Sequence, residues 1–188
     1  LSEVNLSNER PVEYLETNTL SVVKLCNFLR GRSYLERYVH ISSAEIFGNC
    51  EAPATEETCF NPSTAYATSK AAAELYLNTL VRNFDFPALV IRTTNVYGKH
   101  QQLYKIIPRT VIYLKLGKTI KLHARGSAIK AYIHIRDVVR GIRMALERDQ
   151  RGILHFTASK SETVAEVVRK ICTWMGYKFE DVTRPTED

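Results

Sequence analysis

The sequence predicts an α/β fold built around a mostly parallel sheet, and three observations favour this class. Short runs of β-branched and aromatic residues alternate with helical stretches of ten or more residues. Strands that alternate with such helices form parallel sheets, because each return crossing uses a helix. The chain of 188 residues is long enough for a core, and 45% hydrophobic with 24% charged residues is ordinary globular composition.

The first predicted helix covers residues 11–29, and a buried strand over residues 38–41 follows it. Pro11 suits a helix start, because the N–H that proline lacks would have no partner there. Apolar residues recur at helical spacing, at Leu15, Val22, Leu25 and Leu29. The strand consists of Tyr38-Val39-His40-Ile41 and runs into Ser42-Ser43.

A second helix and strand follow a polar, proline-bearing loop over residues 49–62. Residues 65–82 predict a helix, since they are rich in Ala and Leu. Residues 88–92 form the second clear strand, because apolar and β-branched side chains fill it. Residues 93–98, which follow it, have the composition of a loop.

The next helix starts at Pro108 and ends at Gly117, a residue that is common after the last helical turn. Residues 131–135 are typical of a strand. Asp137 is expected to cap a helix that runs to about residue 147.

The last predicted elements are a short strand over residues 153–156 and a helix over residues 163–175. Thr163 and Glu166 have the spacing of a capping box, in which each side chain binds the backbone N–H of the other residue. We find no internal repeat in the sequence.

Polar residues follow the two strongest strands, at residues 42–45 and 93–97. Ligands of parallel sheets bind at the carboxyl ends of the strands, so we expect the site there. Tyr66 and Lys70 lie one helical turn apart, and the lysine cation would stabilise a phenolate that acts as a base. Taken alone, this pair is also common on solvated helices.

Several ordered motifs together resemble the extended short-chain dehydrogenase/reductase family. Within that family the chain is most similar to the NAD-dependent nucleotide-sugar epimerases and dehydratases, in particular the dTDP-glucose 4,6-dehydratase-like enzymes. The motifs are Glu16-Thr17-Asn18, Ser42-Ser43-Ala44-Glu45-Ile46-Phe47-Gly48, Asn61-Pro62-Ser63-Thr64-Ala65, Tyr66-Ala67-Thr68-Ser69-Lys70, Arg92-Thr93-Thr94-Asn95-Val96-Tyr97-Gly98, Lys105-Ile106-Ile107-Pro108, Tyr132-Ile133-His134-Ile135-Arg136-Asp137-Val138 and the turn at Arg184-Pro185.

The resemblance implies a partial Rossmann-like, doubly wound parallel sheet with part of a smaller C-terminal substrate-binding region. Residues 1–98 would form the C-terminal half of the NAD-binding domain, and residues 99–188 a mixed region that binds the nucleotide sugar. The family's Gly-x-x-Gly-x-x-Gly turn is absent from the sequence, and the chain starts at Leu1. We therefore expect a chain truncated at both ends, inactive by itself, and a homodimer in the full-length enzyme.

The resemblance also implies roles for individual residues. Tyr66 would take the proton of the sugar C4 hydroxyl, with Lys70 lowering its pKa and Ser43 binding the same hydroxyl. Glu45 would remove the C5 proton of the resulting 4-keto sugar. Residues implied to contact NAD are Asn18, Ser42, Tyr66, Lys70 and Thr93, and those implied to bind the nucleotide sugar are Asn95, Lys105, His123 and Lys130.

Ala44 departs from the pattern of the 4,6-dehydratases, which usually place Asp there to protonate the departing C6 hydroxyl. Alanine cannot donate a proton, so a 4-epimerase or a decarboxylase of the same family stays open as an alternative. A non-catalytic remnant that binds a nucleotide sugar or a partner protein is a third reading, favoured by the missing glycine turn.

Charge and cysteine content narrow the partners and the compartment. The formal charge of +6 is spread along the chain without a nucleic-acid motif, so we expect no nucleic-acid partner. The four cysteines form no CxxC pair and no metal-binding spacing with histidines, which predicts reduced thiols, no metal and a cytoplasmic location. The apolar runs are short, and we expect no membrane association.

Overall fold

The computed structural model describes residues 1–50 and 52–186 and contains the alternating strands and helices that the sequence predicts. Two compact units form. Leu1–Thr93 and Gly141–Phe156 make up the first, and Thr94–Arg140 and Thr157–Asp188 the second. Each compact unit is built from two separate stretches of chain. The two expected domains, residues 1–98 and 99–188, are continuous and stay a prediction.

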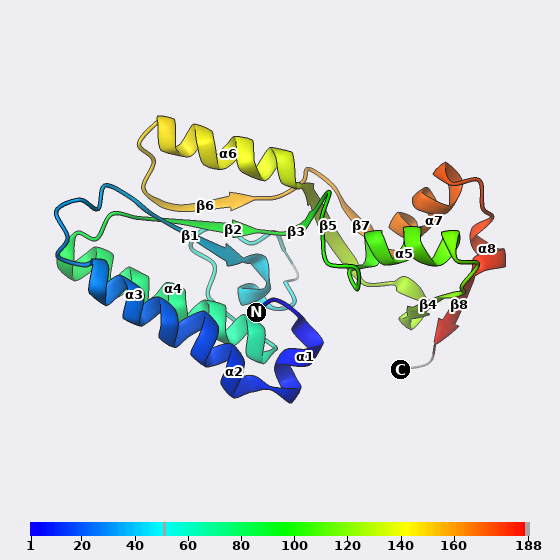
Figure 1. Cartoon of the computed structure of the whole chain (residues 1–188), viewed down its shortest axis with the longest axis horizontal. Helices are drawn as coiled ribbons and strands as arrows, with labels where there is room; N and C mark the ends of the chain where they lie inside the picture. Colours follow the sequence, from blue (N-terminus) through cyan, green and yellow to red (C-terminus); the bar gives the residue numbers. More distant parts are fainter. Residues whose placement is uncertain (51, 187–188) are drawn as a thin grey trace. The chain divides into compact units, whose positions relative to one another are not determined.

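Parallel strands form the sheet of the first unit, in the order β1-β2-β6. The strands are β1 (Tyr38–Ser43), β2 (Ala88–Thr93) and β6 (Gly152–Phe156). Helix α4 (Ala65–Phe84) connects β1 to β2, and α6 (Ile135–Glu147) leads into β6 (Figure 1). The parallel α/β architecture predicted from the sequence is confirmed.

Both faces of the central strand β2 are covered, as a doubly wound sheet requires. Ala88 and Val90 pack against α4 and against the helix that precedes β1, in a cluster with Cys26, Leu77, Leu80 and Phe86. Leu89 and Ile91 point to the other face, where they pack with Ala145 of α6. Helices on opposite faces thus bury alternate residues of β2, which explains why all six residues of this strand are buried.

The helix expected over residues 11–29 is helical throughout but has a π-helical turn in its middle. It consists of α2 (Pro11–Leu15), the π-helix η1 (Glu16–Leu20) and α3 (Ser21–Leu29). Two of its apolar residues, Leu15 and Leu25, are 40% and 48% exposed. The π turn interrupts the spacing of a continuous α-helix. A short helix, α1 (Val4–Glu9), precedes this segment.

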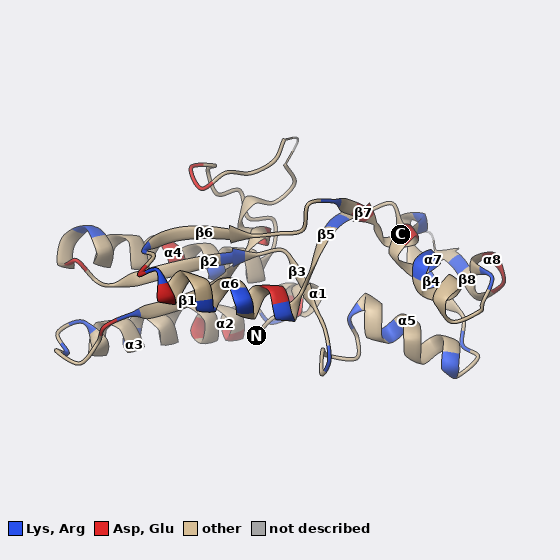
Figure 2. Cartoon of the chain, turned by 90° about the horizontal axis from the view of Figure 1, so that it is seen from above, with Lys and Arg blue, Asp and Glu red and all other residues tan. Residues whose placement is uncertain are grey.

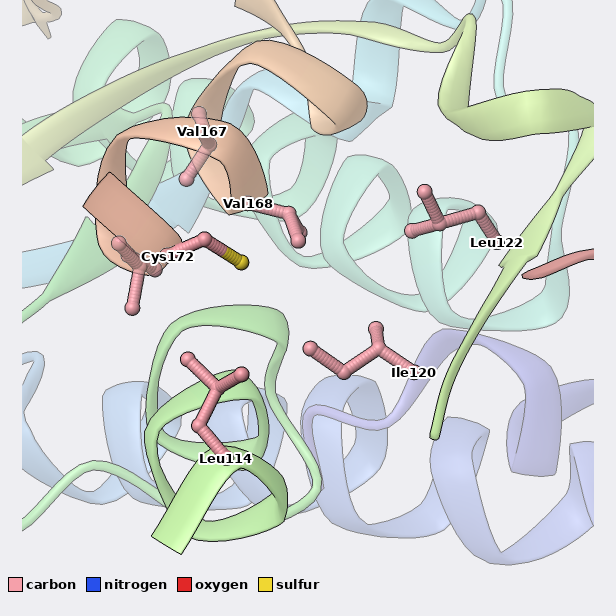
Figure 3. Packing of buried hydrophobic residues seen from close by; sticks show 7 residues of the cluster. Leu114, Ile120, Leu122, Val167, Val168 and Cys172 are labelled. Atoms are coloured by element: carbon pink, nitrogen blue, oxygen red, sulfur yellow. The ribbon is translucent and has the colours of Figure 1, made fainter. Parts of the chain in front are cut away.

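The second unit has two small sheets, with strand orders β3-β5-β7 and β4-β8. The strands are β3 (Asn95–Tyr97), β4 (Ile120–His123), β5 (Ile129–His134), β7 (Ser161–Thr163) and β8 (Thr183–Thr186). Helices α5 (Ile106–Lys115), α7 (Val164–Trp174) and α8 (Phe179–Val182) complete it. Its core, shown in Figure 3, contains Leu114, Ile120, Leu122, Val167, Val168, Ile171 and Cys172.

Local backbone signals in the second unit are borne out in part. The Thr163–Glu166 capping box forms, and Gly117 follows α5 with a φ of +63°. Helix α5 begins at Ile106 rather than at Pro108, and α6 begins at Ile135. Asp137 therefore lies in the first turn of α6 instead of capping it. Arg184-Pro185 lies in strand β8 rather than in a turn.

Charged side chains are distributed over both units rather than gathered on one element (Figure 2). Among the described residues, no helix is long and apolar enough to cross a membrane. No cluster of three or more His, Cys, Asp or Glu side chains within residues 1–50 and 52–186 could hold a metal ion.

Candidate functional site

The candidate site lies at the carboxyl ends of β1 and β2 in the first unit. Ser42 and Ser43 end β1, and Ser43 is paired in register with Thr93 at the end of β2. All three side chains are buried. Helix α4 contacts β1 and the turn that follows it, so the start of α4 lies beside these strand ends.

A 3-10 turn, η2 (Ala44–Phe47), holds Glu45 directly after β1. The Ser43 Oγ accepts a hydrogen bond of 3.2 Å from the Glu45 N–H, while its own O–H can still donate. Gly48 ends the turn with a φ of +62°, where an added Cβ would lie 2.2 Å from the Asn61 carbonyl oxygen. The Ile46 carbonyl accepts from the Asn61 N–H at 2.9 Å. The backbone on both sides of Glu45 is therefore fixed.

Tyr66 lies in the first turn of α4, where backbone contacts hold it. Its N–H donates to the Oγ of the buried Ser7 at 3.0 Å, and its carbonyl accepts from Ser69 Oγ at 2.7 Å. The Tyr66 ring meets the ring of Tyr14 edge to face, with 6.4 Å between the ring centroids. These contacts fix the first turn of α4, which carries the Tyr66 phenol.

Lys70 follows Tyr66 by one turn of α4 and reaches the end of β1. Its Nζ donates to the Ile41 carbonyl at 2.6 Å, which leaves two ammonium N–H groups for other partners. Burial lowers the pKa of Lys70, and the carboxylate of Glu74 opposes this by favouring the charged form. The lysine is thus a desolvated cation next to the predicted base.

Asn18 is buried in the π-helical turn and contacts α4. Its Nδ2 donates to Ser69 Oγ at 3.0 Å, and Ser69 in turn bonds the Tyr66 carbonyl. The neighbouring Thr19 hydroxyl donates to the Ser69 carbonyl at 2.8 Å. Asn18 therefore ties the helix pair together beside Tyr66 and Lys70.

Three buried polar residues near the site were not predicted from the sequence. His40 of β1 is 6% exposed, and burial followed by repulsion from Lys70 lowers its pKa to about 4. Glu74 of α4 and Arg92 of β2 form a buried ion pair. A lone Arg at the end of an apolar strand was a signal for such a partner, because buried charges are paired.

The four residues implied to bind the nucleotide sugar all lie in the second unit. Asn95 in β3 donates from Nδ2 to the Ala131 carbonyl at 3.2 Å, and Lys105 precedes α5. His123 ends β4 and is exposed, with its Nδ1 at 3.3 Å from the Thr186 hydroxyl. Lys130 lies in β5, in register with Glu162 of β7. These residues are separate in the sequence and lie on different elements of the unit.

Sequence comparisons find several related proteins. The model of the NAD dependent epimerase/dehydratase family matches residues 1–156. A dTDP-glucose 4,6-dehydratase of Mycobacterium tuberculosis is 30% identical over 165 residues, which are 86% of this chain and 49% of that protein. The human dTDP-D-glucose 4,6-dehydratase is 25% identical over 202 residues, covering 100% of this chain and 57% of the human protein. The chain spans about half the length of the curated relatives it matches.

Solved structures have the same fold. DesIV, a dTDP-glucose 4,6-dehydratase from Streptomyces venezuelae crystallised with NAD, matches with a TM-score of 0.93 and 26% identity over 100% of this chain and 58% of its own. UDP-N-acetylglucosamine 4-epimerase from Methanobrevibacter ruminantium matches with a TM-score of 0.89 over 98% of this chain and 60% of its own. At 22% identity, the latter similarity shows the fold alone.

Proposed function

The chain belongs to the NAD dependent epimerase/dehydratase family, and we propose that it serves the NAD-dependent modification of a nucleotide-diphosphate sugar through a 4-keto intermediate. The reaction that we propose first is 4,6-dehydration, the activity named for its relatives from M. tuberculosis and S. venezuelae. The observation that carries the proposal is the position of the Tyr66–Lys70 turn beside the end of β1, where Ser43 and Glu45 lie.

In this proposal different residues of the site carry out the two proton transfers, at the C4 hydroxyl and at C5. Tyr66 takes the proton of the C4 hydroxyl as general base, and the Lys70 ammonium stabilises its phenolate. The Ser43 hydroxyl donates a hydrogen bond to the reacting oxygen. Glu45, fixed at the 3-10 turn, removes the proton at C5, which the neighbouring ketone makes acidic.

The residues present fit the nicotinamide-ribose end of NAD. The Ser42 Oγ is buried and has no hydrogen-bond partner among the described residues, as expected of a hydroxyl that awaits a ligand. Ser42 and Thr93 at the strand ends, Asn18 behind α4, and Lys70 with its two remaining N–H groups would hold that end, beside Tyr66. Bound NAD supplies the hydride acceptor for the C4 oxidation and returns the hydride later.

For the nucleotide diphosphate we propose the second-unit set, Asn95, Lys105, His123 and Lys130. Two lysines supply positive charge for the phosphates, and the amide and imidazole supply hydrogen bonds. The domains 1–98 for cofactor and catalysis and 99–188 for the nucleotide sugar belong to the same proposal.

Ala44 favours two alternatives within the family, a 4-epimerase and a decarboxylase. It lies in the 3-10 turn between Ser43 and Glu45, and its methyl group cannot protonate a leaving hydroxyl. An epimerase that acts only at C4 needs neither that acid nor a base at C5. A 4,6-dehydratase and a 4-epimerase therefore differ in whether the reaction requires Glu45.

We predict that Glu45→Gln, in the active protein that contains this chain, stalls the reaction after oxidation at C4. The amide cannot accept the C5 proton, so that exchange of this proton with solvent should slow by about 10²–10⁴-fold. Mass spectrometry of the sugar in deuterated water measures the exchange, and absorbance of reduced nicotinamide measures the stalled state.

The matched control is Glu57→Gln, an exposed carboxylate in the following loop, which should leave both readouts unchanged. Normal C5 exchange in Glu45→Gln would remove Glu45 from the base role. Absence of C5 exchange in the unmodified protein, together with inversion at C4, would identify a 4-epimerase.

We further propose that the active protein is a homodimer and works in the cytoplasm. Apolar side chains between 39% and 57% exposed lie on the helices of the first unit, namely Leu20, Leu25, Phe28, Leu75, Val81 and Phe84. Burial of such side chains against a second copy would remove apolar surface from water. All four cysteines are free, which suits a reducing compartment.

The combined variant Leu25→Glu/Leu75→Glu is predicted to weaken the dimer by about 30-fold or more, because loss of central interface side chains costs about 2 kcal/mol or more. Sedimentation equilibrium measures the dissociation constant. Trp174→Glu, at an 86% exposed position in the second unit, is the control and should leave the dimer intact. A monomeric unmodified protein, or a control as weak as the double variant, would contradict the proposed interface.

A further inference from the structure

A buried ion pair lies one helical turn beyond Lys70. Both Nε and Nη2 of Arg92 donate to Glu74 Oε2 at 2.9 Å, and each side chain is 3% exposed. Arg92 Nη1 also donates to the Glu56 carbonyl at 3.2 Å and lies 3.1 Å from His155 Nε2. The pair joins α4 to β2, whose residues on that face pack against α4.

Stability alone does not account for this pair. Removing two charges from water is costly, and apolar residues of similar volume often serve as well or better at such positions. The hydrogen bonding of Glu74 is also incomplete, since its Oε1 is buried and has no hydrogen-bond partner among the described residues. One oxygen of the Glu74 carboxylate is therefore not bound by Arg92.

Tyr66, Lys70 and Glu74 follow one another at four-residue spacing and thus lie on one face of α4. The Lys70 ammonium is held at the Ile41 carbonyl, in a half-buried position that disfavours its charge. It interacts with Glu74 on its own helix and with His40 from β1. His40 is neutral near pH 7, because its pKa is about 4.

We propose that Glu74, oriented by Arg92, is a positioning residue that keeps the half-buried ammonium of Lys70 charged, one helical turn from Tyr66. This inference rests on the proposed function, in which Lys70 stabilises the Tyr66 phenolate. Arg92 fixes the carboxylate through two N–H groups, so that the anion stays one turn from Lys70. Of the groups that interact with Lys70, Glu74 supplies the negative charge that offsets its burial.

The direction of the effect follows from the charges. Glu74→Gln keeps the size of the side chain and an oxygen for Arg92 but removes the anion. Two effects then favour loss of the Lys70 proton. One is the burial of Lys70, and the other is the positive charge of Arg92, which Glu74 no longer balances. The pKa of Lys70 in this variant should therefore fall below that of Lys70 in the unmodified protein.

The test titrates Lys70 directly, by carbon NMR of the lysine ε-carbon in isotope-labelled protein, with Lys70→Arg to assign the signal. The active protein that contains this chain is used, without and with NAD. The midpoint should be highest in the unmodified protein and lowest in Glu74→Gln. The double variant Glu74→Leu/Arg92→Met, which loses both charges and keeps an apolar core, should lie between them. The alkaline limb of the turnover–pH profile should shift in the same direction.

Glu147→Gln is the matched control, because Glu147 forms an exposed pair with Arg143 on α6. It should leave the Lys70 midpoint unchanged. If Glu74→Gln does not fold, the double variant decides. A Lys70 midpoint equal to that of the unmodified protein in each folded variant would overturn the proposal and leave the pair a structural role. Failure of the proposed function would be seen differently, as normal turnover in a Tyr66 variant, while the Lys70 titration would stand.

Discussion

Replacing Tyr66 with Phe should lower turnover by about 10²–10⁴-fold, the usual contribution of one positioned general base, and leave the fold intact. The substitution removes the phenolic oxygen that would take the C4 proton. The backbone of residue 66 keeps its bonds to Ser7 and Ser69, and the ring keeps its edge-to-face contact with Tyr14. Single-turnover measurement of cofactor reduction reports the chemical step, and circular dichroism reports the fold.

Tyr76→Phe is the control for this experiment, because Tyr76 lies on the same helix and is likewise partly buried. Its turnover should match that of the unmodified protein. A Tyr66→Phe variant with near-normal turnover would remove Tyr66 from the catalytic role and, with it, the proposed reaction mechanism.

Arg92→Leu should be the most destabilising of these substitutions, with a loss of about 3–5 kcal/mol in the free energy of unfolding. It leaves the Glu74 side chain, which is 3% exposed, without its partner in the interior of the first unit. Urea unfolding of the variant and of the unmodified protein measures this loss.

Arg143→Leu provides the comparison, since Arg143 pairs with Glu147 through side chains that are 78% and 56% exposed. Exposed pairs contribute little, so this variant should lose no more than about 0.5 kcal/mol. Equal losses in the two variants would mean that the unpaired buried charge is not the cause.

Long elements with strong patterns could be predicted from the sequence. The helix around Tyr66 and the strand before Arg92 form where composition and apolar spacing predict them. The order of strands and helices predicted the parallel sheet, and the rule for strand ends then placed Ser43 and Thr93 side by side. These inferences succeed because apolar periodicity reflects which face of an element is buried.

Other features depend on contacts between distant residues and were missed. Strands such as β3 and β7 have three residues each, too few for a visible alternation, and their partners fix them. Glu74 looks like any helical glutamate in the sequence, and its burial follows from Arg92 on a different element. The start of α6 at Ile135 was missed for a similar reason, since Asp137 has the residue type of a cap but not its position.

The π-helical turn between α2 and α3 has a consequence for helical phase. An α-helix advances by about 100° per residue, so Tyr14 and Cys26, twelve positions apart, would point in directions about 120° apart. Both are nevertheless buried, at 1% and 0% exposure. A π turn takes up one extra residue, which reduces the effective separation to eleven positions and the angle to about 20°. The extra residue of the π turn thus keeps the buried side chains of both halves of the helix on one face. Leu15 and Leu25 lie outside that face.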